Sequence, residues 1–127
     1  MERFNLPYVV VYIPAYNEEN SIAKVVKKIQ ELYQGKNQKD YVLDVIVIDD
    51  GSKDKTTQAA KEAGANKIVV HPYNRGLGAA TRTGMQTALE MGADIAVKID
   101  ADMQNPPEEI EKVVRPILED KADCVFG

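Results

Sequence analysis

The sequence has 127 residues, 44% of them hydrophobic and 28% charged, and a formal net charge of −4 at pH 7. These values predict one globular domain, and the acidic balance argues against a nucleic-acid-binding protein, which usually presents a basic face. No apolar run approaches the roughly 18 residues that a membrane-spanning helix requires, and the N-terminus lacks the pattern of a signal peptide. The single cysteine, Cys124, cannot form an internal disulfide, so we expect a location in the cytoplasm or at the cytosolic face of a membrane.

Short apolar runs alternate along the chain with segments whose apolar residues recur at helical spacing. The apolar runs are typical of buried strands and lie at 8–13, 42–49, 67–71 and 94–100. Helical spacing predicts helices at 22–33, 54–63 and 79–91. This alternation predicts an α/β fold of the Rossmann type, with a doubly wound, mainly parallel sheet and helices on both faces.

The last part of the chain predicts one more helix and the start of one more strand. In "NPPEE", Asn105 is the expected helix cap and Pro106 the first helical residue, and Pro116 is expected to bend or break this helix. The segment "ADCVFG" (122–127) begins a fifth strand that no helix covers. We therefore expect residues 1–127 to be a single domain, the N-terminal portion of a longer protein truncated after its fifth strand begins.

Polar segments follow three of the four complete strands. They are "PAYNEE" (14–19), "DDGS" (49–52) and "DADMQN" (100–105). In open α/β sheets, ligands bind beyond the carboxyl ends of the strands, at the point where the strand order reverses. A strand order of 3-2-1-4 makes the first and fourth strands neighbours, so it predicts that the three segments share one crevice.

The residues after the first strand do not suit a dinucleotide. A dinucleotide-binding domain places a glycine-rich turn after its first strand to hold a pyrophosphate. This chain has no glycine in that turn and places Glu18 where phosphate would lie. Phosphate groups therefore require a neutralising cation, and Asp102 is the natural residue to hold a divalent metal, which takes its other ligands from phosphate and water. Asp49 and Asp50 are then available to accept hydrogen bonds from a base or from sugar hydroxyls.

Four motifs carry a resemblance to a known family. They are "IPAYNEENSI", "VIVIDDGSKDKT", "NRGLGAATRTGM" and "IDADMQNPPEEI", in this order along the chain. The chain resembles the N-terminal, nucleotide-binding part of the family 2 glycosyltransferases of the GT-A fold. Within that family it is most similar to the dolichyl-phosphate mannose synthases and related polyprenyl-phosphate sugar transferases. It departs from many relatives at Ala101, where they have glycine, and at Asn105, where histidine is frequent.

The resemblance implies roles for the residues at the strand ends. It assigns Asp102 to the metal, Mg²⁺ or Mn²⁺, and Asp100 to the ribose or, through water, to the metal. It assigns the nucleotide-binding residues Pro14, Tyr16, Glu18, Ile48, Asp50, Asp100, Ala101 and Gln104. The catalytic residues stay unknown, and we expect them beyond Gly127.

The implied reaction is a metal-dependent, inverting sugar transfer. The donor is a nucleotide-diphosphate sugar, GDP-mannose or a UDP-hexose, and the acceptor a polyprenyl or dolichyl phosphate or a glycan. Because a cation stabilises the charge on the departing diphosphate, the site requires Mg²⁺ or Mn²⁺. These 127 residues are expected to bind donor but to transfer little, since the acceptor side and any membrane association belong to the missing C-terminal part.

Two other functions stay open from the sequence. A haloacid-dehalogenase-like phosphatase also ends a hydrophobic strand in Asp-x-Asp, but it normally has threonine or valine where this chain has Gln104. A non-catalytic, Mg²⁺-binding receiver-like domain requires an aspartate at the end of its third strand, where this chain has His71. Simpler structural interpretations also exist: the aspartates as turn residues, Tyr16 as core packing, His71 as a strand-end residue and Arg75 as a solvated loop residue.

Overall fold

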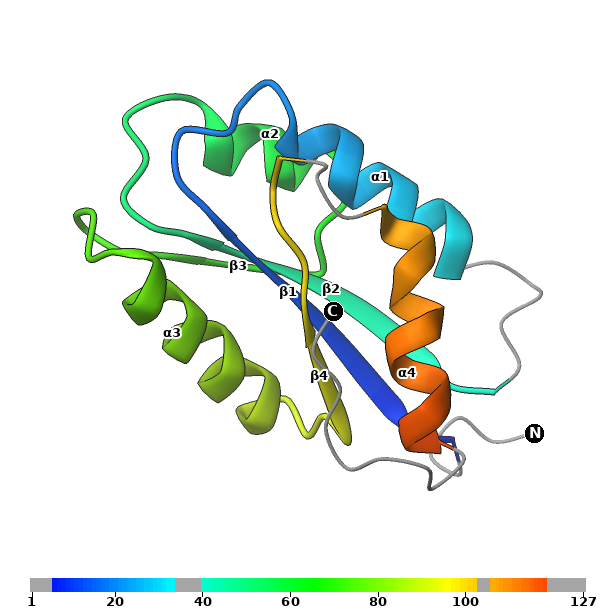
Figure 1. The fold of residues 1–127 in the computed structure, drawn as a ribbon. Coiled ribbons are helices and arrows are strands. Elements are labelled where there is room, and N and C mark those ends of the chain that lie inside the picture. The colour runs from blue at the N-terminus through cyan, green and yellow to red at the C-terminus, as the bar shows by residue number, and fades with distance from the viewer. Residues whose placement is uncertain (1–5, 34–39, 103–105, 119–127) are drawn as a thin grey trace.

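A computed structural model describes residues 6–33, 40–102 and 106–118 of the chain (Figure 1). Its centre is a four-stranded, fully parallel sheet in the order β3-β2-β1-β4. The strands are β1 (Tyr8–Ala15), β2 (Val42–Asp49), β3 (Lys67–Val70) and β4 (Ile95–Lys98). The predicted parallel sheet and its 3-2-1-4 order are confirmed, whereas the predicted fifth strand lies outside the described residues.

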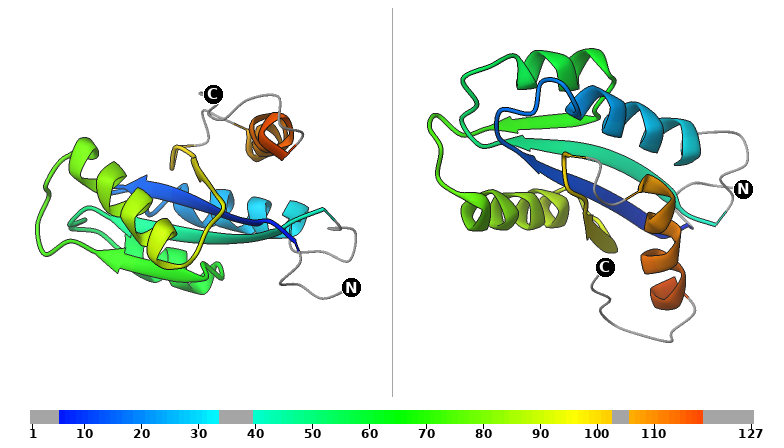
Figure 2. Two further views of the ribbon diagram at one scale, coloured as in Figure 1. Left: turned by 90° about the horizontal axis from the view of Figure 1, so that it is seen from below. Right: turned by 45° about the horizontal axis from the view of Figure 1, so that its top comes forward.

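Helices connect the strands and cover both faces of the sheet. They are α1 (Ile22–Tyr33), α2 (Thr56–Glu62), α3 (Leu77–Glu90) and α4 (Ile110–Leu118), the last preceded by the 3₁₀ turn η2 (Pro107–Glu109). In Figures 1 and 2, α1 and α2 lie on one side of the sheet and α3 lies on the other. None of these described helices combines the length and the apolarity required to span a bilayer.

The start of the last helix differs from the prediction by one residue. Pro106 occupies the cap position, with an extended backbone, and Pro107 is the first residue of the turn. Asn105, the expected cap, lies outside the described residues. Pro116 does not end the helix, which continues to Leu118. A proline in the last turn removes a single backbone hydrogen bond, and the buried Ile110 and Val114 keep the helix packed on the core.

Two separate hydrophobic cores lie against the two faces of the sheet. Alternate residues of β1, such as Val9 and Val11, pack with α1, α2 and α4, whereas Val10 and Tyr12 pack with α3. Burial on both faces explains why "YVVVYI" is a continuous apolar run rather than an alternating one. Because all four strands are parallel, their carboxyl ends lie at the same edge of the sheet.

Helix α3 approaches the sheet closely because it presents small residues to it. A Cβ atom added to Gly84 would lie 2.3 Å from Cδ2 of Tyr12. Ala80 and Ala88, four residues before and after, are buried in the same core. The small residues of α3 thus form the face that packs on the sheet.

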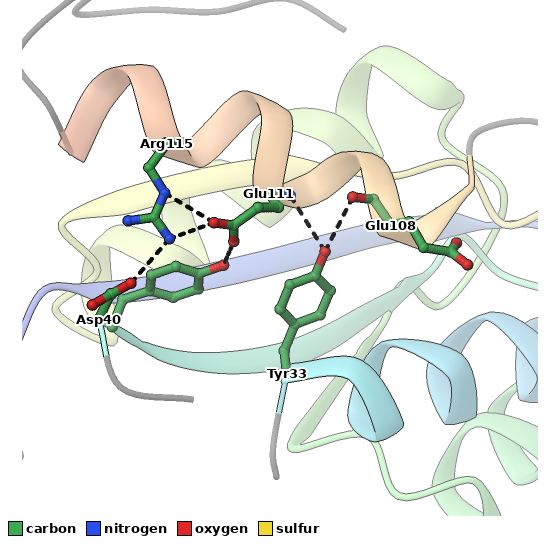
Figure 3. Close-up of polar contacts among 6 residues, drawn as sticks. Tyr33, Asp40, Glu108, Glu111 and Arg115 are labelled. Atoms are coloured by element: carbon green, nitrogen blue, oxygen red, sulfur yellow. Dashed lines mark hydrogen bonds and ion pairs between the residues drawn. The ribbon is translucent and has the colours of Figure 1, made fainter. Parts of the chain in front are cut away.

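A cluster of polar side chains fixes α4 to α1 and to the start of β2 (Figure 3). The hydroxyl of Tyr33 donates to the carbonyl of Pro107 at 2.9 Å and accepts from the N–H of Glu111 at 3.3 Å. The Glu111 carboxylate accepts from Tyr41 and pairs with Arg115, which also donates to Asp40 at 3.1 Å. Burial raises the pKa of Tyr33, so its hydroxyl remains a donor at neutral pH.

Replacing Tyr33 with phenylalanine is expected to destabilise the chain by about 1–2 kcal/mol, because the Pro107 carbonyl and the Glu111 N–H both lose their partner. Urea unfolding monitored by circular dichroism measures this difference. The matched control is Tyr73→Phe: Tyr73 is 66% exposed, and losing its hydroxyl is expected to change stability by less than about 0.5 kcal/mol. Equal effects of the two substitutions would contradict the structural role of the Tyr33 hydroxyl.

Candidate functional site

The loops after β1 and β2 and the turn after β4 meet at the carboxyl edge of the sheet. The parallel register pairs Ala15 with Asp49, and the N–H of Asp50 donates to the carbonyl of Ala15 at 2.8 Å. On the other side of β1, the hydroxyl of Ser21 lies 2.8 Å from the carbonyl oxygen of Ala101. The described parts of the three polar segments, 14–19, 49–52 and 100–102, are therefore brought to one edge (Figure 1), as the strand order predicts.

Asn17 fastens the loop after β1 to the loop after β2. Its φ of 54° is a left-handed conformation that asparagine adopts more readily than most residues. Its N–H donates to Ser52 Oγ at 2.8 Å, and its Oδ1 accepts from the N–H of Lys53 at 2.9 Å. Asn17 is not among the residues predicted for the site, and the available signal for its role is an asparagine two residues after a buried strand.

Asp49 has a structural role at the start of α2. It is 2% exposed; its Oδ1 accepts from the N–H of Ser52 at 2.9 Å and its Oδ2 from the hydroxyl of Thr57. Both carboxylate oxygens of Asp49 thus accept hydrogen bonds from the turn that leads into the helix, and the expectation that Asp49 also binds a base or sugar hydroxyls stays a prediction.

Asp50 organises the loop that leads from β3 to α3. Its Oδ1 accepts from His71 Nδ1 at 2.8 Å and from the N–H of Arg75 at 2.9 Å, and its Oδ2 accepts from the N–H of Gly76 at 2.9 Å. Burial alone would raise the pKa of Asp50, but these hydrogen bonds outweigh it and hold the pKa below its usual value. The carboxylate is therefore ionised at neutral pH.

His71 joins Asp50 to α3. Its Nδ1 faces Asp50 and its Nε2 lies 2.9 Å from Thr83 Oγ1, so a ring protonated on Nδ1 donates to the carboxylate and accepts from the hydroxyl. The ring is 5% exposed. His71 does lie at the end of a strand, as predicted, but the sequence did not indicate its hydrogen bonds. Through them it links the ends of β2 and β3 to α3.

The residues assigned to the nucleoside differ in their access to a ligand. Tyr16 is 40% exposed and Glu18 half-buried, whereas Ile48 is fully buried in the core beneath α3 and Pro14 is buried within β1. Ile48 and Pro14 are thus buried in the central strands, and the nucleoside contact assigned to them stays a prediction. Asp50 is 3% exposed, and its ligand role stays a prediction.

Asp100 and Asp102 lie on either side of a buried residue. Ile99 and Ala101 are each 5% exposed and belong to the core beside α1, whereas Asp100 is half-buried and Asp102 exposed. The alternation of the strand continues into the turn, which explains the one-residue spacing of the two carboxylates. Gln104, also assigned to the nucleotide, lies outside the described residues.

This edge suits a cation that is shared with a ligand. Among the described residues, no group of three or more His, Cys, Asp or Glu side chains is arranged to hold a metal ion. Mg²⁺ is usually bound through one or two carboxylates together with phosphate oxygens and waters. The exposed carboxylate of Asp102, with Asp100 two residues earlier, fits that donor set when a phosphate completes it.

The family model of glycosyl transferase family 2 matches residues 10–127. The chain belongs to this family. The UDP-N-acetylglucosamine–dolichyl-phosphate N-acetylglucosaminyltransferase of Methanococcus voltae is 39% identical over 135 residues, covering 94% of this chain and 51% of the relative. The dolichol-phosphate mannosyltransferase of Pyrococcus furiosus is 33% identical over 122 residues, covering 94% of this chain and 32% of the relative. The resemblance to the dolichyl- and polyprenyl-phosphate branch of family 2 is thereby confirmed.

This family 2 chain spans about half the length of the first three curated relatives, of which it covers 51%, 49% and 50%. A crystal structure of glucosyl-3-phosphoglycerate synthase from Mycobacterium tuberculosis matches with a TM-score of 0.69 and 32% identity, covering 88% of this chain and 39% of that one. That crystal contains Mn²⁺, UDP-glucose and phosphoglyceric acid. The fold is accordingly the GT-A fold.

The two alternative functions do not agree with the observed topology. A receiver-like domain has the strand order 2-1-3-4-5, whereas the order here is β3-β2-β1-β4. A dehalogenase-like phosphatase usually carries its Asp-x-Asp motif at the opening of the domain, whereas Asp100 and Asp102 follow the fourth strand. Family 2 membership and the strand order therefore exclude both alternatives.

Proposed function

We propose that this chain is the donor-binding part of a metal-dependent, inverting glycosyltransferase. It binds a nucleotide-diphosphate sugar, GDP-mannose or a UDP-hexose, and the acceptor of the whole protein is a polyprenyl or dolichyl phosphate. The observation that carries the proposal is the position of the Asp100–Asp102 turn, joined through Ser21 to the loop that contains Glu18 and Tyr16. Relatives named for dolichyl phosphate and a structural neighbour holding Mn²⁺ and UDP-glucose support it.

Charge explains how these residues serve the reaction. Asp102, with Asp100, would hold Mg²⁺ or Mn²⁺, and the bound ion would supply a Lewis acid for the negative charge that develops on the departing nucleoside diphosphate. Glu18 disfavours a diphosphate that lacks its cation, and thus favours the metal-bound donor. A lipid phosphate acceptor is already an anion and attacks without a general base. Attack from the side opposite the leaving group inverts the anomeric centre.

The proposal extends to the surroundings of the whole protein. A lipid phosphate acceptor lies at a membrane, so the complete enzyme acts in the cytoplasm or at the cytosolic face of a membrane. The single cysteine fits a reducing compartment. Fractionation of cells that produce the full-length protein tests this location, and recovery in a secreted fraction would contradict it.

Isothermal titration of the chain with UDP and with GDP, each with and without Mn²⁺, tests the donor site. We expect binding that depends on the metal and disappears with a chelator, and the tighter nucleotide identifies the base. Asp102→Asn is expected to weaken this binding at least about tenfold, because a metal ligand loses its charge.

The matched control is Asp94→Asn. Asp94 lies at the opposite edge of the sheet, where its carboxylate accepts from the N–H of Tyr8 at 2.7 Å, and the substitution is expected to leave nucleotide binding unchanged. An absence of metal-dependent heat with both nucleotides would refute the proposed function.

A further inference from the structure

Ser21, directly before α1, lies between two parts of the proposed site. Its Oγ is 2.7 Å from Oε2 of Glu18 and 2.8 Å from the carbonyl oxygen of Ala101. Glu18 belongs to the loop after β1, and Ala101 lies between the two aspartates assigned to the metal. One hydroxyl therefore connects the nucleotide loop to the metal-binding turn, although 80 residues separate Ser21 from Ala101.

The contacts of Ser21 differ from those of an ordinary helix cap. A serine cap accepts a hydrogen bond from a backbone N–H of the first helical turn. In each of the two contacts described above, the Ser21 hydroxyl is instead the only group that can donate. Its backbone carbonyl already accepts from the N–H of Val25 at 3.2 Å. The hydroxyl is thus directed toward the carboxyl edge of the sheet.

A hydroxyl group has one hydrogen, which it can donate to only one of these two acceptors at a time. A carboxylate accepts a charge-assisted bond that is stronger than the bond to a neutral carbonyl, so the carboxylate of Glu18 draws the hydrogen toward itself. A ligand hydroxyl or N–H that donates to Glu18 weakens that preference. The hydrogen is then free to bind the Ala101 carbonyl, which fixes the backbone between Asp100 and Asp102.

We propose that Ser21 is a positioning residue for the metal, and that it orients the Asp100–Asp102 turn in response to the occupancy of Glu18. This inference rests on the proposed donor-binding function and adds a residue that is not among those assigned to the metal or the nucleotide. Ala101 is 5% exposed, so its side chain holds the turn on the core side while Ser21 holds its carbonyl. Both constraints act on the backbone that carries the two flanking carboxylates.

The experiment measures Mn²⁺ affinity in the presence of saturating UDP or GDP, from the electron paramagnetic resonance signal of free Mn²⁺. Ser21→Ala is expected to weaken Mn²⁺ binding about fivefold, since one hydrogen bond to the turn is lost. Ser21→Thr keeps the hydroxyl and is expected to remain within about twofold of the wild type. Should Ser21→Ala not fold, Ser21→Cys, with a weak donor of similar size, takes its place in the comparison with Ser21→Thr.

The matched control is Thr87→Val on α3. The Thr87 hydroxyl donates to the carbonyl of Thr83 at 2.7 Å, in a buried position within a single helix. Its removal is expected to lower stability toward urea without changing Mn²⁺ affinity. Unchanged affinity in Ser21→Ala, or an equal loss in Thr87→Val, would overturn the role of Ser21. If the wild type itself binds neither nucleotide with Mn²⁺, the proposed function fails and this inference fails with it.

Discussion

Replacing Gly51 with alanine is expected to destabilise the chain by about 3 kcal/mol. Gly51 has a φ of 73°, a conformation that costs a residue with a side chain roughly 1–2 kcal/mol. An added Cβ would lie 2.3 Å from the carbonyl carbon of Tyr73 and 2.5 Å from the backbone nitrogen of Asn74. Both are backbone atoms, so the loop must move as a whole, and the N–H groups of Arg75 and Gly76 are then drawn away from Asp50.

Gly64→Ala separates the steric contribution from the conformational one. Gly64 also has a positive φ, 96°, but an added Cβ there meets nothing within 4 Å. It ends α2 in the manner common for glycine, so alanine is expected to cost only about 1 kcal/mol through its backbone. Urea unfolding of the two variants measures the difference. If both lose the same stability, the close contact between Gly51 and the β3–α3 loop does not hold in solution.

The fold could be predicted because its determinants are local in the sequence. The run 8–13, "YVVVYI", is apolar throughout, as expected of a strand covered on both faces, and helical spacing from Ile22 to Tyr33 defines the inner face of α1. The chain also places its polar residues at the ends of strands. Once the alternation of strands and helices predicts a parallel sheet, these ends fall at one edge.

The element boundaries were less predictable. Strand β4 was expected at 94–100 and extends only from Ile95 to Lys98, because its pairing with β1 runs from Val9 to Tyr12. The cap of the last helix lies one residue later than predicted, because two successive prolines offer two possible helix starts. The ends of β4, in contrast, depend on which residues of β1 are available for pairing, and the local sequence does not contain that information.

Roles within the site could be predicted only in part. In the sequence, Asp49 and Asp50 are two equal acidic residues before a Gly-Ser turn, yet one serves the turn into α2 and the other the loop after β3. The partner of Asp50 is 21 residues away at His71, and the contact between Ser21 and Ala101 joins residues 80 positions apart. Such pairs depend on tertiary packing. A single sequence contains no signal that would select them.

Replacing Asp50 with asparagine is expected to destabilise the chain by about 3 kcal/mol at pH 7. The amide has one oxygen, whereas the native carboxylate accepts from a backbone N–H on each side, Arg75 at Oδ1 and Gly76 at Oδ2. In either orientation the NH₂ group faces one of these N–H groups. His71 can change its tautomer to suit an amide, but a backbone N–H cannot, so a buried donor always loses its acceptor.

The matched control for Asp50→Asn is Asp94→Asn, in which the amide oxygen can still accept from the single N–H of Tyr8. That substitution is expected to cost less than about 1 kcal/mol in urea unfolding. Equal stability losses in the two variants would show that the two-sided hydrogen bonding of Asp50 contributes nothing.

The pH dependence of Asp50→Asn provides a second, independent test. The pKa of Asp50 is lower in the folded chain than its usual value of 3.8. Its contribution to stability is therefore fully present above that unfolded value and is lost as the pH falls through the folded pKa. The other carboxylates titrate in both proteins, so on the acid side the difference in unfolding free energy between wild type and variant reports the loss of the Asp50 charge. We expect this difference to shrink as the pH falls below about 4. A difference that grows on acidification would mean that burial, rather than the donors from His71, Arg75 and Gly76, dominates the ionisation of Asp50.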